Sequence, residues 1–205
     1  MNPMKYYCLS LLILFCTSVF GQLDDDFSDG DISSSPAWLG DTGDFEAAGN
    51  VLQLNAASGD AGTSTLSTVQ TAFGETTWEF LVHFDFRPSG SNYSKIYLSS
   101  DQEDLTGDLN GYFVVVGDGS DEVSLYQQSG SSEAVVIDGT DGMVNVNPVH
   151  IRVKVTRTLA GNWSLFHDTT GGTTYSQEGA AVQDLTHTTS AYFGVTPIYT
   201  STRSD

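Results

Sequence analysis

The stretch Trp78-Glu-Phe-Leu-Val-His-Phe-Asp-Phe-Arg87 decides the fold class of this 205-residue chain. Large apolar residues occupy every second position, and the positions between them are polar, with Leu81 as the exception. Successive side chains of a β-strand point to opposite faces of its sheet, so this alternation predicts a strand with one buried and one hydrated face. The apolar set is Trp78, Phe80, Val82, Phe84 and Phe86, and the polar set is Glu79, His83, Asp85 and Arg87.

Other segments continue the β pattern on both sides of this stretch. Residues 151–156 alternate in the same way, and residues 112–116 are apolar at five successive positions, which is typical of a strand covered on both faces. The pair Gly161-Asn162 predicts a tight hairpin. Turn-forming residues bound the other predicted strands, which are Val51–Asn55, Ser64–Thr68, Ser94–Ser99, Glu122–Gln127, Ala134–Asp138, Trp163–His167, Thr173–Gln177 and Ala191–Thr196.

Apolar residues nowhere recur at helical spacing over ten residues or more, so no substantial helix is predicted. A sheet with one apolar face must bury that face against another layer, and no helix is available to supply one. We therefore predict an all-β fold in which about a dozen antiparallel strands form a two-sheet sandwich.

The first 21 residues have the pattern of a signal peptide. Lys5 precedes an apolar run over residues 9–15. Residues 19–21 follow at the spacing of a signal-peptidase cleavage site. The apolar run is shorter than the ~20 residues that span a bilayer, so we expect no membrane insertion. The pattern predicts export, with the mature chain beginning at Gln22.

Residues 22–205 are predicted to form a single domain. Both cysteines, Cys8 and Cys16, fall in the predicted signal peptide. The mature chain would therefore use neither disulfides nor thiolate chemistry.

The charge of the chain is strongly negative. Asp and Glu number 26 against 7 Lys and Arg, for a formal charge of -19 at pH 7. Nucleic acids and anionic membranes are bound through Lys and Arg, so neither is an expected partner.

An acidic segment over residues 24–31 suggests a calcium site, because Ca²⁺ takes closely spaced carboxylate and carbonyl oxygens. The spacing does not fit an EF-hand loop. We name Asp24, Asp26 and Asp29 as the candidate ligands of a different calcium site. The alternative is a hydrated acidic segment that ends in an Asp-Gly turn.

No catalytic residues are assigned from the sequence. Glycoside hydrolysis needs two carboxylates about 5–10 Å apart. The strand motif E-x-D-x-E is absent, and Glu79 and Asp85 would be roughly 20 Å apart on one extended strand. Neither G-x-S-x-G nor H-E-x-x-H occurs, so we expect the protein not to be an enzyme.

The candidate ligand-binding residues combine an aromatic ring with polar groups, as sugar sites do. Trp38 lies among turn formers and is the best candidate for an exposed ring, although it could instead plug one end of the sandwich. His83 and Asp85 share the hydrated face of their strand. Arg152 and Lys154 also project from a hydrated face, where the alternative is pairing with acidic residues on a neighbouring strand. Other aromatic residues available to such a site include Trp78, Trp163, Tyr93, Tyr97, Tyr126, Tyr175 and Tyr199.

Several short motifs resemble the N-terminal module of large secreted proteins of Bacteroidetes-type bacteria, in the concanavalin A-like or laminin-G-like jelly-roll class. The resemblance covers nearly all of the mature chain and implies a curved two-sheet jelly roll, surface export and further domains downstream. It carries over no catalytic residue, because the carboxylate motif of the glucanase branch is absent. It also implies a closing strand after residue 205. The motifs are Asp26–Asp31, Trp38–Phe45, Leu52–Asn55, Trp78–Phe80, Asn110–Phe113 and Phe193–Val195.

These observations predict a non-catalytic, exported β-sandwich module that binds polysaccharides or cell-surface glycans, or serves as an adhesion or spacer domain. The alternative is a divergent glycoside hydrolase or polysaccharide lyase of the same fold. A purely structural segment without a ligand is the third interpretation.

Overall fold

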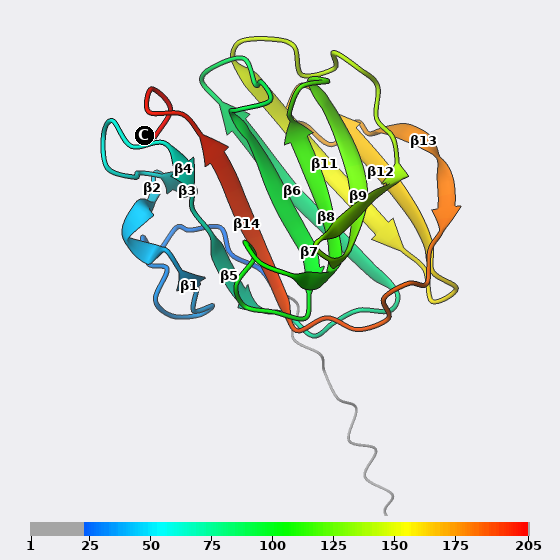
Figure 1. Ribbon diagram of the computed structural model, residues 1–205. Coiled ribbons are helices and arrows are strands. Elements are labelled where there is room, and N and C mark those ends of the chain that lie inside the picture. Colours follow the sequence, from blue (N-terminus) through cyan, green and yellow to red (C-terminus); the bar gives the residue numbers. More distant parts are fainter. Residues whose placement is uncertain (1–22, 205) are drawn as a thin grey trace, which may run out of the picture.

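A computed structural model of the chain describes residues 23–204 (Figure 1). The predicted signal peptide lies outside the described residues. Fourteen strands and one short 3-10 helix, Thr42–Asp44, make up the regular structure within them. The strands are β1 (Leu39–Gly40), β2 (Phe45–Ala48), β3 (Val51–Leu54), β4 (Gly62–Thr63), β5 (Leu66–Val69), β6 (Thr76–Phe84), β7 (Tyr93–Ser100), β8 (Leu109–Gly117), β9 (Glu122–Gly130), β10 (Ser132–Ile137), β11 (Val149–Arg157), β12 (Asn162–Asp168), β13 (Ser176–Gln183) and β14 (Tyr192–Tyr199).

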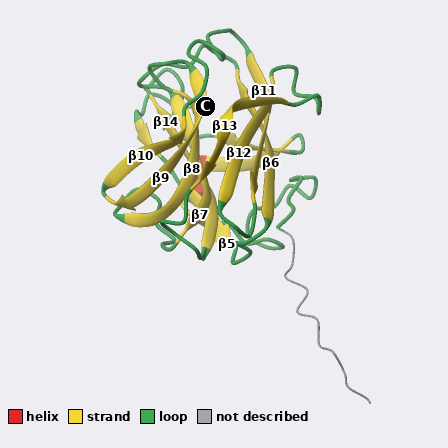
Figure 2. Ribbon diagram, turned by 90° about the vertical axis from the view of Figure 1, so that its right-hand side faces the viewer, coloured by secondary structure: helices red, strands yellow, loops and turns green. Residues whose placement is uncertain are grey.

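Two antiparallel sheets form the sandwich. The large sheet has the order β1-β5-β14-β7-β8-β9-β10, with β4 paired to the end of β14, and the small sheet has the order β13-β12-β11-β6. Figure 2 shows β7 to β10 on one side of the molecule and the small sheet on the other. Strands β2 and β3 form a separate hairpin. The predicted all-β, two-sheet antiparallel architecture is confirmed.

Strand β6 follows the alternation of its sequence. Trp78 is buried and Glu79 and His83 are exposed, as predicted. Phe80 and Phe84 are only half-buried, because β6 forms the edge of the small sheet and has a neighbour on one side only. The strand ends at Phe84, three residues before the predicted end.

The core lies between the two sheets and is rich in aromatic and β-branched residues. From the large sheet, Tyr112 and Val114 point inward, and from the small sheet Val153 and Trp163 meet them. The predicted hairpin between β11 and β12 turns through Gly161, whose positive φ of 75° suits glycine.

Two strand predictions need correction. The strand predicted over residues 191–196 runs instead over Tyr192–Tyr199, past Pro197, because β14 is hydrogen-bonded to β5 and to β7 inside the large sheet (Figure 1). Strand β13 covers residues 176–183 rather than 173–177, because the pairing with β12 outweighs the weak strand preference of Gly179 and its alanine neighbours. No helix among the described residues is long and apolar enough to cross a bilayer.

Candidate functional site

The outer face of the small sheet brings together most of the residues predicted to bind a ligand. Lys154 lies opposite Glu79 in the pairing of β11 with β6. Arg152 reaches Glu79 with its Nη1 atom, 3.4 Å from Oε1. Lys154 instead places its ammonium group over the ring of Tyr175, 3.9 Å from the centroid. Both cations thus have partners within the protein, and the alternative of cross-strand pairing holds for Arg152.

His83 and Asp85 lie at the end of β6 on the same face. The His83 Nε2 atom is 3.0 Å from Asp85 Oδ1. His150, which the sequence did not single out as a ligand-binding residue, is directly opposite His83 on β11. The two imidazole rings meet edge to face, with centroids 5.5 Å apart.

Trp38 is not the exposed ring that we expected. It is only 5% exposed and packs against Phe27 and Phe193, with ring centroids 5.8 and 6.2 Å away. Its Nε1 atom donates a hydrogen bond to Asp25 Oδ2 at 2.8 Å. A long-range apolar cluster buries this ring despite its turn-rich surroundings, so the alternative of a packed tryptophan is correct.

The predicted calcium ligands Asp24, Asp26 and Asp29 all line one shallow depression of about 270 Å³. Asp26 Oδ1 accepts a hydrogen bond from the backbone of Ser28 at 3.0 Å, and Asp29 Oδ1 accepts one from the backbone two residues later. Hydrogen bonds from Ser28 lower the pKa of Asp26. Within residues 23–204 no three His, Cys, Asp or Glu side chains are placed to hold a metal ion together. The calcium site stays a prediction.

An aromatic row crosses the outer face of the large sheet, on the side away from the core. Tyr97, Phe113 and Tyr126 are aligned across β7, β8 and β9 by the strand pairing. Phe113 lies between the other two, with ring centroids 5.0 Å from Tyr97 and 5.3 Å from Tyr126. Phe113 is fully buried and Tyr126 is half-buried, so the ring of Tyr126 is partly accessible to solvent and packs on a buried aromatic ring.

Charged and hydroxyl groups border this row. Lys95 places its Nζ atom 4.7 Å from the centroid of Phe113 and forms an ion pair with Glu133. Tyr93 is half-buried and lies two residues before Lys95, on the same face of β7. Burial raises the pKa of Tyr93, and the carboxylate of Glu133 adds to the shift. The Tyr97 hydroxyl donates to Gln128 Oε1 at 2.9 Å.

The loop between β7 and β8 covers one part of this face. Leu105 and Leu109 pack on Tyr97 and Phe113. Leu105 also lies over Gly194 of β14, where a Cβ atom would come within 2.5 Å of Leu105 Cδ1. Only glycine at position 194 leaves room for this close packing. The same loop also lines a second depression in the surface.

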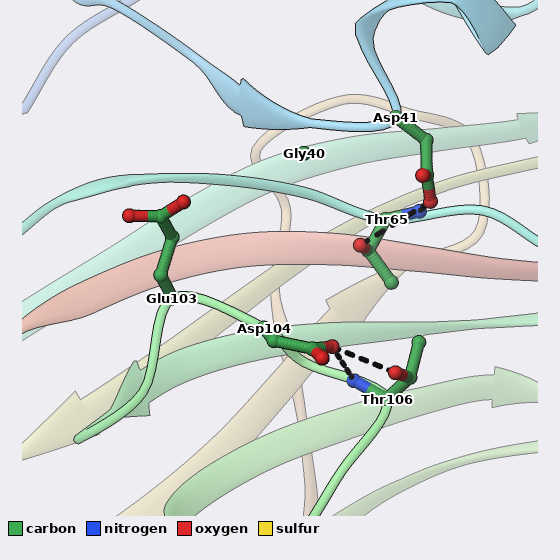
Figure 3. A pocket seen from close by; sticks show the side chains of 6 residues that line it. All are labelled: Gly40, Asp41, Thr65, Glu103, Asp104 and Thr106. Atoms are coloured by element: carbon green, nitrogen blue, oxygen red, sulfur yellow. Dashed lines mark hydrogen bonds between the residues drawn. The ribbon is translucent and has the colours of Figure 1, made fainter.

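This second depression, of about 340 Å³, is lined with carboxylates (Figure 3). Asp41 Oδ2 accepts a hydrogen bond from the backbone of Thr65 at 2.9 Å. Asp104 Oδ1 accepts two from Thr106, at 2.8 and 2.7 Å, and these lower the pKa of Asp104. Glu103 makes none of the hydrogen bonds drawn (Figure 3). The other lining residue is Gly40.

A buried carboxyl group, that of Glu122, lies at the start of β9. It is 3% exposed and accepts a hydrogen bond from Ser124 Oγ at 2.7 Å. Burial raises the pKa of Glu122, and the nearby carboxylates of Asp138, Asp141 and Asp118 contribute in the same direction. Ser124 Oγ in turn accepts a hydrogen bond from the backbone of Gly139 at 2.8 Å, which ties β9 to the loop after β10.

The sequence did not single out the aromatic row, although its two tyrosines, Tyr97 and Tyr126, were noted together with the neighbouring Tyr93. Tyr93, Lys95 and Tyr97 alternate with Ser94, Ile96 and Leu98, so each set of alternate positions in β7 contains both apolar and polar residues. The alternation alone therefore does not identify the outer face of β7, and only the structure shows that Tyr93, Lys95 and Tyr97 lie outside the core.

Comparisons with known proteins identify the fold. No protein-family model matches the sequence, and no curated protein matches it. The carbohydrate-binding module CBM66 from Bacillus subtilis superposes with a TM-score of 0.56 at 16% identity, over 80% of this chain and 88% of that one. The fold is a concanavalin A-like jelly roll.

Other jelly rolls agree with this result. The exoplasmic/lumenal domain of VIP36 in its Ca²⁺-bound form gives a TM-score of 0.54 at 13% identity, over 86% of this chain and 82% of that one. Its Ca²⁺/Man3GlcNAc-bound form gives 0.53 at 12% identity, over 80% and 78%. At these identities the likeness concerns the jelly-roll fold alone.

Proposed function

We propose that the protein is a non-catalytic glycan-binding module, and that a polysaccharide or cell-surface glycan lies on the outer face of the large sheet. The observation that carries the proposal is the stack of Tyr126 on the buried Phe113, beside the half-buried Tyr93. A sugar ring has an apolar face that packs on aromatic rings, and hydroxyl groups that need polar partners at the edge. Lys95 and Glu133 supply such partners.

The comparisons support this assignment. CBM66 is described as a carbohydrate-binding module, and the VIP36 domain has been seen with mannose and with Man3GlcNAc. The acidic depression next to the loop between β7 and β8 would add hydrogen-bond acceptors for sugar hydroxyl groups, through Asp41, Glu103 and Asp104.

A hydrolase or lyase of the same fold is the alternative function. A glycoside hydrolase needs a carboxylic acid with a raised pKa that touches the substrate. Asp104 has a lowered pKa, and Glu122 has a raised pKa but is buried. Neither Asp104 nor Glu122 therefore combines a raised pKa with access to a substrate. Incubation with a panel of polysaccharides, followed by analysis of chain length, tests the alternative.

Affinity electrophoresis on polysaccharide gels, preceded by a glycan array to choose the ligand, tests the proposed face. We expect Tyr126→Ala and Tyr93→Ala each to weaken binding at least about tenfold, as is usual for aromatic anchors. The matched control is the double variant Arg152→Ala/Lys154→Ala on the small sheet. Loss of binding in the control alone would move the site to the face that the sequence suggested. Absence of any glycan ligand would contradict the proposed function.

We also propose that the protein is exported and that calcium stabilises it through Asp24, Asp26 and Asp29. Export rests on the signal-peptide pattern of residues 1–21, and an adhesion or spacer role with downstream domains rests on the resemblance described above. The Ca²⁺-bound forms of the VIP36 domain support the calcium part. Calcium should raise the melting temperature more than magnesium at equal ionic strength, and Asp26→Asn should remove the difference. Equal shifts for both ions would leave only charge screening.

A further inference from the structure

We propose that His83 and His150 together bind a zinc-like transition-metal ion on the outer face of the small sheet. The two residues are 67 positions apart in the sequence but directly opposite each other in the pairing of β6 with β11. Their Nδ1 atoms are 3.4 Å apart. This site lies on the opposite sheet from the proposed glycan face and does not depend on it.

The separation of the two nitrogen atoms suits a shared metal ion. Zinc binds histidine nitrogen at about 2.0–2.1 Å, and two such ligands at a tetrahedral ion are about 3.3–3.4 Å apart. The Nδ1 atoms of His83 and His150 lie at this separation. Imidazole is a good ligand for Zn²⁺, Cu²⁺ and Ni²⁺, whereas Ca²⁺ and Mg²⁺ prefer oxygen.

Asp85 fixes the tautomer of His83 that such a site requires. The carboxylate can only accept a hydrogen bond, so at 3.0 Å it holds the proton on His83 Nε2. The lone pair of His83 is then on Nδ1, and it accepts the Nδ1 proton of His150. Metal-binding histidines usually donate their other ring N–H to a carboxylate in this manner.

Metal binding replaces the hydrogen bond between the rings by two coordination bonds. The proton of His150 moves from Nδ1 to Nε2 by exchange with water, so the ring stays neutral and no proton is lost, and both Nδ1 lone pairs are given to the ion. The remaining positions of the ion go to water, since Asp85 contacts the far nitrogen of His83.

The loop after β12 holds the ring of His150 in place. Gly171 has a positive φ of 73°, and a Cβ atom there would come within 2.2 Å of His150 Nε2. The carbonyl oxygen of Gly171 accepts a hydrogen bond from Arg152 Nε at 3.1 Å, which joins this loop to the sheet. A ligand that is fixed before binding costs less conformational entropy when the metal arrives.

The other two histidines are less suited to bind an ion from solvent. The side chain of His167 is 14% exposed and pairs with the buried Glu178 at 3.1 Å. His187 contacts the carbonyl oxygen of Gln128 through Nε2 at 2.7 Å. By contrast, the side chain of His83 is 48% exposed.

Calorimetric titration of the purified protein with Zn²⁺, in a large excess of Ca²⁺ that saturates carboxylate sites, tests the proposal. We expect one zinc ion per chain. His83→Ala and His150→Ala should each weaken binding at least about tenfold. Asp85→Asn should weaken it about tenfold, because loss of a group that hydrogen-bonds to a metal-binding histidine costs 10–100-fold in affinity. The control His187→Gln should bind zinc as the wild type does.

Ring ¹⁵N spectra of the histidines give a second measurement, in which zinc should shift the Nδ1 signals of His83 and His150. Circular dichroism of each variant checks that the domain is folded. Absence of zinc binding by the wild type, or undiminished affinity in both alanine variants, would overturn the site. Undiminished affinity in Asp85→Asn would overturn the role given to Asp85.

Discussion

The indole rings of Trp78 and Trp163 stack in the core, with centroids 5.5 Å apart and planes only 13° from parallel. They come from β6 and β12, which are separated by β11 in the small sheet. Tyr112 of the large sheet reaches Trp163 with its ring centroid 4.4 Å away. Trp163 therefore connects two strands of one sheet to the other sheet.

Replacement of Trp163 should be among the most damaging single changes in the chain. The side chain is fully buried, so Trp163→Ala loses its transfer free energy and leaves a cavity, at a cost of about 3–5 kcal/mol. Urea unfolding measures the free energy. Leu159→Ala is the matched control, since Leu159 is 76% exposed, and should stay within about 0.5 kcal/mol of the wild type. Equal losses in the two variants would contradict the assigned core.

The hydroxyl group of Tyr112 joins the large sheet to the segment after β13. It donates to Asp184 Oδ1 at 2.6 Å and accepts from the backbone of His187 at 3.2 Å. Burial raises the pKa of Tyr112 to about 12, and the bond to Asp184 acts in the same direction. Tyr112→Phe should cost about 1–3 kcal/mol, because the carboxylate of Asp184 loses a donor in a half-buried place.

Hydrogen exchange shows where this loss acts. Amides near residues 184–187 should exchange faster in Tyr112→Phe, while those of β11 follow only the global stability. Tyr126→Phe is the control and should leave this segment unchanged. A uniform increase across the whole domain would mean that the hydroxyl group does not hold the segment locally.

The strand alternation was predictable because each residue's face depends only on its own position. For this reason the buried and exposed sides of β6 and β11 follow from the sequence. The opposition of His83 to His150 depends instead on the register between strands far apart in the chain. The burial of Trp38 was not predictable for the same reason, since the ring of Phe193, which helps to bury it, comes from the other end of the sequence.

The position of β14 illustrates a further limit. Residues 191–196 are apolar and precede Pro197, which is typical of an edge strand, yet β14 has neighbours on both sides. Its interior place depends on the pairing with β5, whose residues lie more than a hundred positions earlier. Gly194 contributes as well, because it leaves room for the backbone of Leu66.

Gly111 is expected to tolerate no side chain. A Cβ atom there would lie 2.0 Å from the backbone oxygen of Ser99, in the pairing of β8 with β7. Gly111→Ala must push these central strands apart, at a cost of about 1–3 kcal/mol or more. Gly43→Ala is the matched control, because nothing lies within 4 Å of its Cβ position. Thermal unfolding compares the two, and equal melting temperatures would contradict the close approach.

Glu122 should make the stability of the domain depend on pH in the direction opposite to most carboxylates. Burial raises the pKa of Glu122 in the folded state, so over the range between its unfolded and folded pKa the folded protein holds the proton more strongly. The unfolded state binds fewer protons there, and stability falls as pH rises through this range. Below both pKa values the group is protonated in both states and has no such effect.

Glu122→Gln isolates this contribution, because the amide stays neutral and its oxygen can still accept the hydrogen bond from Ser124. The other carboxylates are present in both proteins and cancel in the difference. Relative to the wild type, the variant should therefore gain stability as pH is raised from about 4 to about 7. Urea unfolding at several pH values measures the difference in free energy between the two proteins. A difference that stays constant with pH would mean that the folded protein does not shift the pKa of Glu122, while a gain toward low pH would mean that its pKa is lowered.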